Sequence, residues 1–208
     1  MKSSDVSPRQ NKKIRTRRAI IESAYALFKK NGYAKATVAE IAKAANIAPR
    51  TFFSYFSSKE DVLFVEISDI DRDLEASLRN RKSSDTALDV LHAWIIAQVQ
   101  QFTRQDAYIH QLRRKIIISQ VSLQAREKFY FSQIEALLKR EIARDLGVKE
   151  NNLIPAITAS ASRAALEIAY DYARKNPINK KTANELIAIA DQSMLFLRGG
   201  IAAIKTDH

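Results

Sequence analysis

The chain has 208 residues and no cysteine, and 34 Lys and Arg against 23 Asp and Glu give it a net charge of +11. This length allows one large or two small domains. The absence of cysteine excludes disulfides, thiolate catalysis and cysteine-ligated metal sites. Only four glycines and four prolines interrupt a chain rich in Ala, Leu, Lys, Arg and Gln, so the composition predicts an all-α protein.

The positive charge is concentrated near the N-terminus. Residues 1–65 hold 13 Lys and Arg against 5 Asp and Glu, a net of +8, whereas the remainder has a net of +3. Such a concentration indicates a protein that binds a polyanion. No uninterrupted apolar run approaches the ~18 residues of a membrane span, and the polar N-terminus lacks the apolar core of a secretory signal. We therefore expect a cytoplasmic protein that does not bind a membrane.

In chain order, residues 1–10 are predicted to form a flexible arm and residues 11–30 a first helix. Residues 37–59 read TVAEIAKAANIAPRTFFSYFSSK, in which two short helical patterns meet at a tight turn. Thr37 and Glu40 form a capping box that marks the start of the first of these helices. Asn46 tolerates the left-handed backbone of such a turn, and Pro49 suits the first turn of the second helix. This pattern is typical of a helix-turn-helix, which places its second helix in a DNA major groove.

The rest of the chain also reads as helices. Ser57 and Glu60 form a possible second capping box, which would open a long helix to about residue 80. The later helices are predicted at residues 86–102, 105–116, 119–146, 153–175 and 181–199, with stop signals at Gly147, Asn176-Pro177 and Gly199-Gly200.

Together with Gly32-Tyr33 before it and residues 58–63 (SKEDVL) after it, the motif resembles the DNA-binding domain of the TetR family of transcriptional repressors. The resemblance covers about residues 15–63; beyond them only the helical pattern and the chain length match. It implies a nine-helix, all-α fold with a three-helix DNA-binding domain at residues 11–57 and a ligand-binding and dimerisation domain at residues 58–208. It also implies a homodimeric repressor that a small-molecule effector releases from a palindromic operator.

Three positions differ from the usual family pattern. Asn46 and Arg50 stand where glycine is common in the family. Phe53 stands where the family usually has a tyrosine whose hydroxyl contacts phosphate. Phe53 is therefore either exposed for van der Waals contact with DNA or turned inward.

Arg50 is the best candidate for reading a base, because a guanidinium can bond O6 and N7 of guanine together. Ala48, Pro49 and the Thr51 methyl group are placed to contact thymine methyl groups. The resemblance implies that Tyr55 and Lys59 contact the phosphate backbone, and the helix start at Thr37 suits a phosphate. Three further arginines either clamp the backbone, enter the minor groove or form an ordinary solvated helix face. The full expected DNA-binding set is Arg15, Arg17, Arg18, Thr37, Ala48, Pro49, Arg50, Thr51, Phe53, Tyr55 and Lys59.

The second domain offers candidates for two further interfaces. An effector pocket could be lined by aromatic side chains and by a cationic cluster at residues 113–115. Three interpretations of this cluster remain open: a solvated helix face, a patch near DNA, or a binding site for an anionic ligand such as an acyl-coenzyme A. The ligand candidates are Trp94, Phe102, Arg113, Phe129 and Tyr170, and for each aromatic ring ordinary core is the alternative. Small residues at 155–165 and the apolar last helix predict a four-helix bundle with a second copy, or packing within one chain.

Other classes of protein fit the sequence less well. His92 and His110 have no histidine four residues away, and no Glu-x-x-His pair or glycine-rich loop occurs. We therefore expect no metal, no cofactor and no enzymatic activity. The alternative is a DNA-coating protein without sequence preference, although the ordered motif, Arg50 and the large second domain favour sequence-specific binding.

Overall fold

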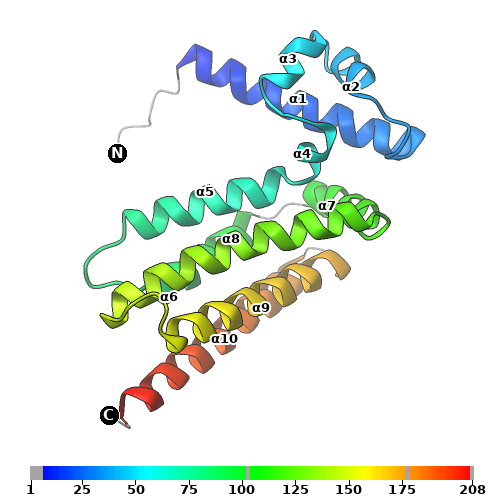
Figure 1. Cartoon of the computed structure of the whole chain (residues 1–208). Coiled ribbons are helices and arrows are strands. Elements are labelled where there is room, and N and C mark those ends of the chain that lie inside the picture. The colour runs from blue at the N-terminus through cyan, green and yellow to red at the C-terminus, as the bar shows by residue number, and fades with distance from the viewer. Residues whose placement is uncertain (1–6, 102–103, 177–178, 207–208) are drawn as a thin grey trace. The chain divides into compact units, whose positions relative to one another are not determined.

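The computed structural model describes residues 7–101, 104–176 and 179–206, in which every regular element is a helix. The chain divides into two compact units, which we call the head (residues 1–65) and the body (residues 66–208). The head contains α1 (Pro8–Asn31), α2 (Val38–Ala44), α3 (Pro49–Phe53) and α4 (Lys59–Leu63) (Figure 1). The remaining helices are α5 (Val65–Arg79), α6 (Ala87–Gln101), α7 (Arg104–Ile118), α8 (Val121–Leu146), α9 (Leu153–Lys175) and α10 (Lys180–Thr206).

The all-α prediction is confirmed, but the described residues form ten helices rather than nine. The helix predicted from residue 58 to about residue 80 is interrupted at Phe64, whose φ of −106° and ψ of 9° leave the helical region. The capping box that opens this segment begins at Ser58, not Ser57, because the Ser58 N–H donates to Asp61 Oδ2 at 2.9 Å.

Two helix ends also differ from the prediction. Residues 8–10, expected in the arm, form the first turn of α1, because Pro8 takes the first helical position and Ser7 Oγ accepts from the Gln10 N–H at 3.3 Å. Residues 1–6 of the expected arm lie outside the described residues. At the other end, α10 continues through Gly199-Gly200 to Thr206. Each interior glycine lowers the stability of a helix by about 1 kcal/mol relative to alanine. The two glycines at the predicted stop therefore destabilise α10 locally but do not end it.

The core of the head joins α1 to the helix-turn-helix. Ile20, Ala24 and Phe28 of α1 are buried, as are Ile41 of α2 and Phe52 of α3. These side chains pack the two short helices α2 and α3 against the long helix α1. Because helices this short are not stable alone, α2 and α3 are stabilised by this packing.

In the body, α8 packs against α9, α10 packs against α9 and α6, and α7 packs against α8 and α9 (Figure 1). The end of α8 is tied to the start of α6, because the Ala87 N–H donates to Asp145 Oδ2 at 2.5 Å. His92 of α6 pairs with Asp191 of α10 at 2.6 Å. These contacts hold the helices in register around α8.

One helix in the described residues is long and apolar enough to cross a membrane by length and composition, although the sequence has no uninterrupted apolar run of that length. It is the Lys180–Ala203 part of α10, in which a window of 18 residues has a mean hydropathy of 1.3. Polar residues are spread along this segment, so the sequence shows no uninterrupted apolar run there. Length and composition alone are weak evidence for a span, because core helices of globular proteins share both. Only 22% of that window is buried within the chain.

Candidate nucleic-acid interface

The turn between α2 and α3 is built as the motif predicts. Thr37 Oγ1 accepts from the Glu40 N–H at 3.2 Å, and the Thr37 N–H donates to Glu40 Oε2 at 2.8 Å, which completes the capping box of α2. Asn46 takes a left-handed φ of 54°, and it is the one non-glycine residue with positive φ among those described. Pro49 opens α3, where its missing N–H is not needed.

The start of α3 is exposed. Ala48, Pro49 and Arg50 face solvent, and Thr51 is half-buried. The Arg50 side chain makes no ion pair or hydrogen bond with any residue in the described part of the chain. On the opposite side Phe52 is fully buried, so the core orients the helix and leaves its N-terminal end free.

Phe53 is 56% exposed and therefore points outward. Its ring meets the ring of Phe52 edge to face, with centroids 5.6 Å apart. Tyr55, next along the surface, is half-buried and lies just beyond the end of α3. Phe53 thus adds an apolar surface beside Arg50 where a tyrosine would add a hydroxyl.

Lys59 is engaged within the head. Its Nζ donates to the carbonyl oxygens of Tyr33, Ala34 and Ala36 at 2.9, 3.3 and 2.9 Å, and lies 4.6 Å from the centre of the Tyr33 ring. Tyr33 in turn donates its hydroxyl to Glu60 Oε1 at 2.6 Å. An ammonium has three donors, so in this arrangement Lys59 holds the loop between α1 and α2. Sequence reasoning missed this role because the acceptors lie more than twenty residues away.

The three arginines of α1 that were expected to bind DNA have different surroundings. Arg15 is exposed. The Arg17 guanidinium lies 5.8 Å from the centre of the Phe56 ring, and Arg18 pairs with Glu22 at 2.8 Å on the exposed side of the helix. Of the three, Arg15 is the most available to an external phosphate.

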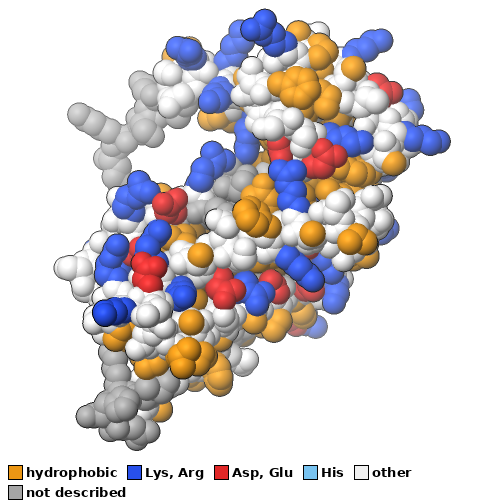
Figure 2. Space-filling model, viewed as in Figure 1, with side chains coloured by type: hydrophobic (Ala, Val, Ile, Leu, Met, Phe, Trp, Pro, Cys, Tyr) orange, Lys and Arg blue, Asp and Glu red, His pale blue; other side chains and the backbone are white. Residues whose placement is uncertain are grey.

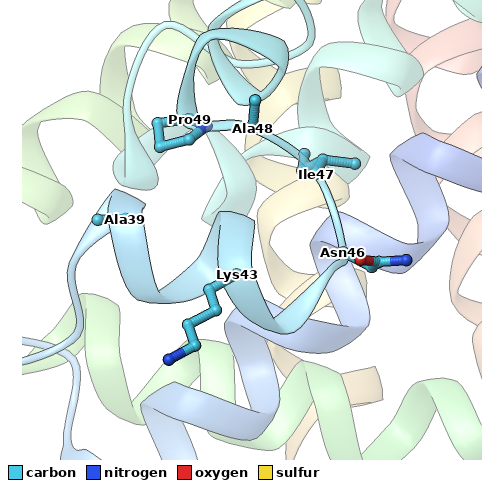
Figure 3. A pocket seen from close by; sticks show the side chains of 6 residues that line it. All are labelled: Ala39, Lys43, Asn46, Ile47, Ala48 and Pro49. Carbon is cyan, nitrogen blue, oxygen red and sulfur yellow. The ribbon is translucent and has the colours of Figure 1, made fainter.

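An open hollow lies between α2 and the start of α3 (Figure 3). It is lined by Ala39, Lys43, Asn46, Ile47, Ala48 and Pro49. Lys43 was not among the residues predicted from the sequence, although its exposure on the same face as Ala39, four residues earlier, could have indicated it. Lys43 adds a positive charge on the α2 side of this hollow, and its side chain points away from Ala48 and Pro49 (Figure 3).

Lys and Arg side chains outnumber acidic ones over the head, whereas blue and red side chains alternate over the body (Figure 2). The acids in the described part of the head are held by internal bonds. Hydrogen bonds from the Thr37 backbone and hydroxyl lower the pKa of Glu40 below its usual range. Burial raises the pKa of Glu60, but the bonds from Tyr33, the backbone and Ser58, together with the Lys59 charge, outweigh it and lower that pKa. Both carboxylates therefore stay ionised and contribute to the fold.

The structure brings two of the expected ligand residues together in the body. Arg113 is 1% exposed, and its guanidinium lies 5.3 Å from the centre of the half-buried Tyr170 ring. Trp94 is buried in α6. Phe129 is 59% exposed and contacts Tyr130, away from these buried groups, while Phe102 lies outside the described residues. The described residues contain no group of three or more His, Cys, Asp or Glu side chains that could hold a metal ion.

Comparisons with known proteins agree with this geometry. The model for bacterial regulatory proteins of the tetR family matches residues 20–65, and the model for the MftR C-terminal domain matches residues 85–200. The transcriptional regulator TcmR of Streptomyces glaucescens is 28% identical over 193 residues, which cover 90% of this chain and 84% of TcmR. MftR of Mycobacterium tuberculosis is 28% identical over 153 residues, which cover 74% of this chain and 77% of MftR.

Among solved structures, FadR of Thermus thermophilus, a TetR-family transcriptional repressor in complex with lauroyl-CoA, has a TM-score of 0.55 at 20% identity. The match covers 87% of this chain and 92% of FadR, and at this identity it shows the fold alone. The MftR C-terminal match by itself covers more than half of the chain, and the tetR match covers the helix-turn-helix. The chain therefore belongs to the TetR family of DNA-binding transcriptional regulators.

Proposed function

We propose that this protein is a homodimeric repressor that reads a palindromic operator with α3 of each head and that a small-molecule effector releases. The observation that carries the proposal is the position of Arg50. It stands at the exposed start of α3, free of any acid in the described residues, on a head with a net charge of +8. A guanidinium in that position suits a guanine in the major groove.

The neighbouring residues divide into two roles. Ala48, Pro49 and Thr51 border Arg50 and offer apolar contacts to thymine methyl groups, and the exposed Phe53 ring extends this apolar surface. The phosphate contacts fall to Thr37, Lys43, Tyr55 and three arginines of α1, namely Arg15, Arg17 and Arg18. Lys59 acts indirectly, because its donors already hold the loop that precedes α2.

A second copy is needed because one short helix reads only a few base pairs. A row of exposed apolar side chains on α9 supports a dimer: Leu153, Ile157 and Ile168 are 73%, 66% and 61% exposed and follow one face of the helix. On α10, Leu195 and Phe196 are each 75% exposed. We call these five residues the α9–α10 seam. Covering it with the same seam of a second copy gives the predicted four-helix bundle and accounts for the exposed apolar surface of α10.

Effector control requires that the ligand bind the arrangement unable to bind DNA more tightly than the arrangement that binds it. The complex of FadR with lauroyl-CoA supports a small-molecule site in proteins of this fold. The proposed site of action is the cytoplasm, where a bacterial operator is accessible.

Binding selection on randomised DNA, followed by gel-shift competition, tests the proposal. A sequence-specific regulator should enrich a palindrome and prefer it to random DNA by roughly 10³-fold or more. The rival, a DNA-coating protein, would bind all sequences alike. A flat selection would therefore reject the proposal, whatever the salt or the protein concentration.

A further inference from the structure

The loop between α1 and α2, residues 32–37, carries Thr37, one of the proposed phosphate contacts. The loop is not helical, so side chains from elsewhere in the head help to fix its position. Two consecutive residues at the start of α4, Lys59 and Glu60, bond to it from more than twenty residues away. This arrangement indicates how the head holds a DNA contact in place.

Lys59 bonds to the backbone of the loop, whereas Glu60 bonds to one of its side chains. Glu60 Oε1 accepts from the Tyr33 hydroxyl at 2.6 Å, in a partly buried position. The Tyr33 ring meets the Phe28 ring edge to face, with centroids 5.2 Å apart, and the Lys59 ammonium lies 4.6 Å from its centre. Because the Tyr33 carbonyl also accepts from Lys59, the bond to Glu60 fixes the side chain in the orientation that serves both contacts.

The charge of Glu60 should act against DNA binding. Burial raises the pKa of Glu60, but the bonds from Tyr33, the backbone and Ser58, together with the Lys59 charge, lower it overall, so the side chain is a carboxylate. A carboxylate on a DNA-binding head repels phosphate. If Glu60 nevertheless favours binding, it acts through its bond to Tyr33 and not through its charge.

We propose that Glu60 is a positioning residue for DNA binding, which acts through Tyr33 to hold the α1–α2 loop and Thr37 in place for a phosphate. This inference rests on the proposed function, because it concerns one of the phosphate contacts of that surface. A loop that is already fixed in the binding arrangement loses less conformational entropy when DNA binds. The Glu60 carboxylate therefore favours binding without touching DNA.

Two substitutions of Glu60 separate its bond from its charge. Both remove the charge, but Glu60→Gln keeps an oxygen that can accept from the Tyr33 hydroxyl, whereas Glu60→Ala does not. Fluorescence anisotropy with a labelled duplex of random sequence measures affinity, because a phosphate contact acts on every sequence. Glu60→Gln should bind at least as tightly as the wild type, and Glu60→Ala about three- to tenfold more weakly than Glu60→Gln. Equal affinities of the two variants would overturn the proposal.

Tyr33→Phe tests the other end of the bond with a smaller change, since it removes one oxygen and keeps the ring that packs on Phe28. It should weaken DNA binding by about three- to tenfold, and adding Glu60→Ala should cause no further loss, because both changes remove the same bond. Urea unfolding checks that each variant is folded during the titration. An unchanged affinity in Tyr33→Phe would reject the proposal even if Glu60→Ala did not fold.

Glu22→Ala is the matched control. Glu22 is an acid of the same head, and it pairs with Arg18 on the exposed side of α1. Its removal changes the net charge as Glu60→Ala does but leaves the α1–α2 loop intact, so it should not weaken binding. A loss as large as that of Glu60→Ala would show that Glu60 has no special role.

The inference and the proposed function can fail separately. The random duplex tests Glu60 without reference to an operator, so a flat DNA selection rejects the proposed function while the difference between Glu60→Ala and Glu60→Gln can still hold. An enriched palindrome together with equal binding of those two variants rejects only the role of Glu60.

Discussion

Arg50 shows how one side chain can be tested for reading bases rather than for simply adding charge. On an operator obtained by selection, Arg50→Ala should weaken binding by about 10- to 100-fold, because a bidentate contact to guanine contributes about 1–3 kcal/mol of discrimination. Binding to random DNA should change little. Gel-shift titrations on both DNAs measure the difference.

Lys43→Ala is the matched control for Arg50, because it removes one positive charge from the neighbouring hollow. If Lys43 contacts phosphate, this variant weakens binding to both DNAs by the same factor. A pattern in which Arg50→Ala also weakens both DNAs equally would reduce Arg50 to a phosphate contact.

Lys59 should matter for stability more than for contact with DNA. Lys59→Met keeps most of the aliphatic stem but removes three bonds to the loop before α2. Hydrogen bonds from charged groups contribute about 1.5–3 kcal/mol when buried, and this site is only half-buried, so we expect a loss of about 1–2 kcal/mol in the free energy of unfolding. Urea unfolding monitored by circular dichroism measures it. Lys35→Met, at an exposed position in the same loop, should have little effect; equal losses would contradict the role given to Lys59.

At the scale of the element, the capping box of α2 predicts an acid sensitivity. The pKa of Glu40 is lowered in the fold by its bonds to Thr37, from a usual value of 4.5. A group with a lowered folded pKa stabilises the protein above its unfolded pKa and loses that contribution as the pH falls through the folded pKa. The melting temperature should therefore fall as the pH drops below about 4.5, and less steeply in Glu40→Gln. Thr37→Ala should likewise make the melting temperature depend less steeply on pH. If the slope is unchanged in both variants, the capping box is not the source of the acid sensitivity.

The α9–α10 seam makes a second prediction at this scale. Leu195→Glu with Phe196→Glu places two charges on the exposed face of α10 and should convert a dimer into a monomer, because buried unpaired charges are costly. Light scattering after size-exclusion chromatography gives the mass. Phe129→Glu changes a similarly exposed ring on α8, outside the seam, and should leave the dimer intact. If the wild-type protein is a monomer at micromolar concentration, the α9–α10 seam is not a dimer interface.

The elements that sequence reasoning placed well are those with local signals. The ends of α8 and α9 carry Gly147 and Asn176-Pro177, and the predicted ends at residues 146 and 175 are the observed ones. The break at Phe64 had no such signal, because its side chain is fully buried and tertiary packing decides its backbone. The head core and the turn at Asn46 were predictable; the engagement of Lys59, which depends on a distant loop, was not.

For the molecule as a whole, Arg50 and Arg113 show the same difference between what local sequence signals predict and what distant packing decides. The exposure of Arg50 follows from the motif, since the second helix of a helix-turn-helix presents its N-terminal end. The burial of Arg113 does not follow from its sequence, RRK, which reads equally well as a solvated face. It depends on α8 and α9, which place Glu127 and Tyr170 beside it. Long-range packing therefore decides the burial of Arg113, which the sequence left open.

The proposed dimer, with its two basic heads, predicts how binding depends on salt. Each phosphate that a protein neutralises on duplex DNA contributes about −0.9 to the slope of log K against log salt concentration. If each head neutralises about four phosphates, the slope should be near −7. The seam variant with Glu at positions 195 and 196 should show about half that slope on a half-site, because one head then binds alone. Titrations between 50 and 300 mM KCl measure both. A wild-type slope near −3 would mean that a single head carries the binding, and the two-headed mode of reading would then be wrong.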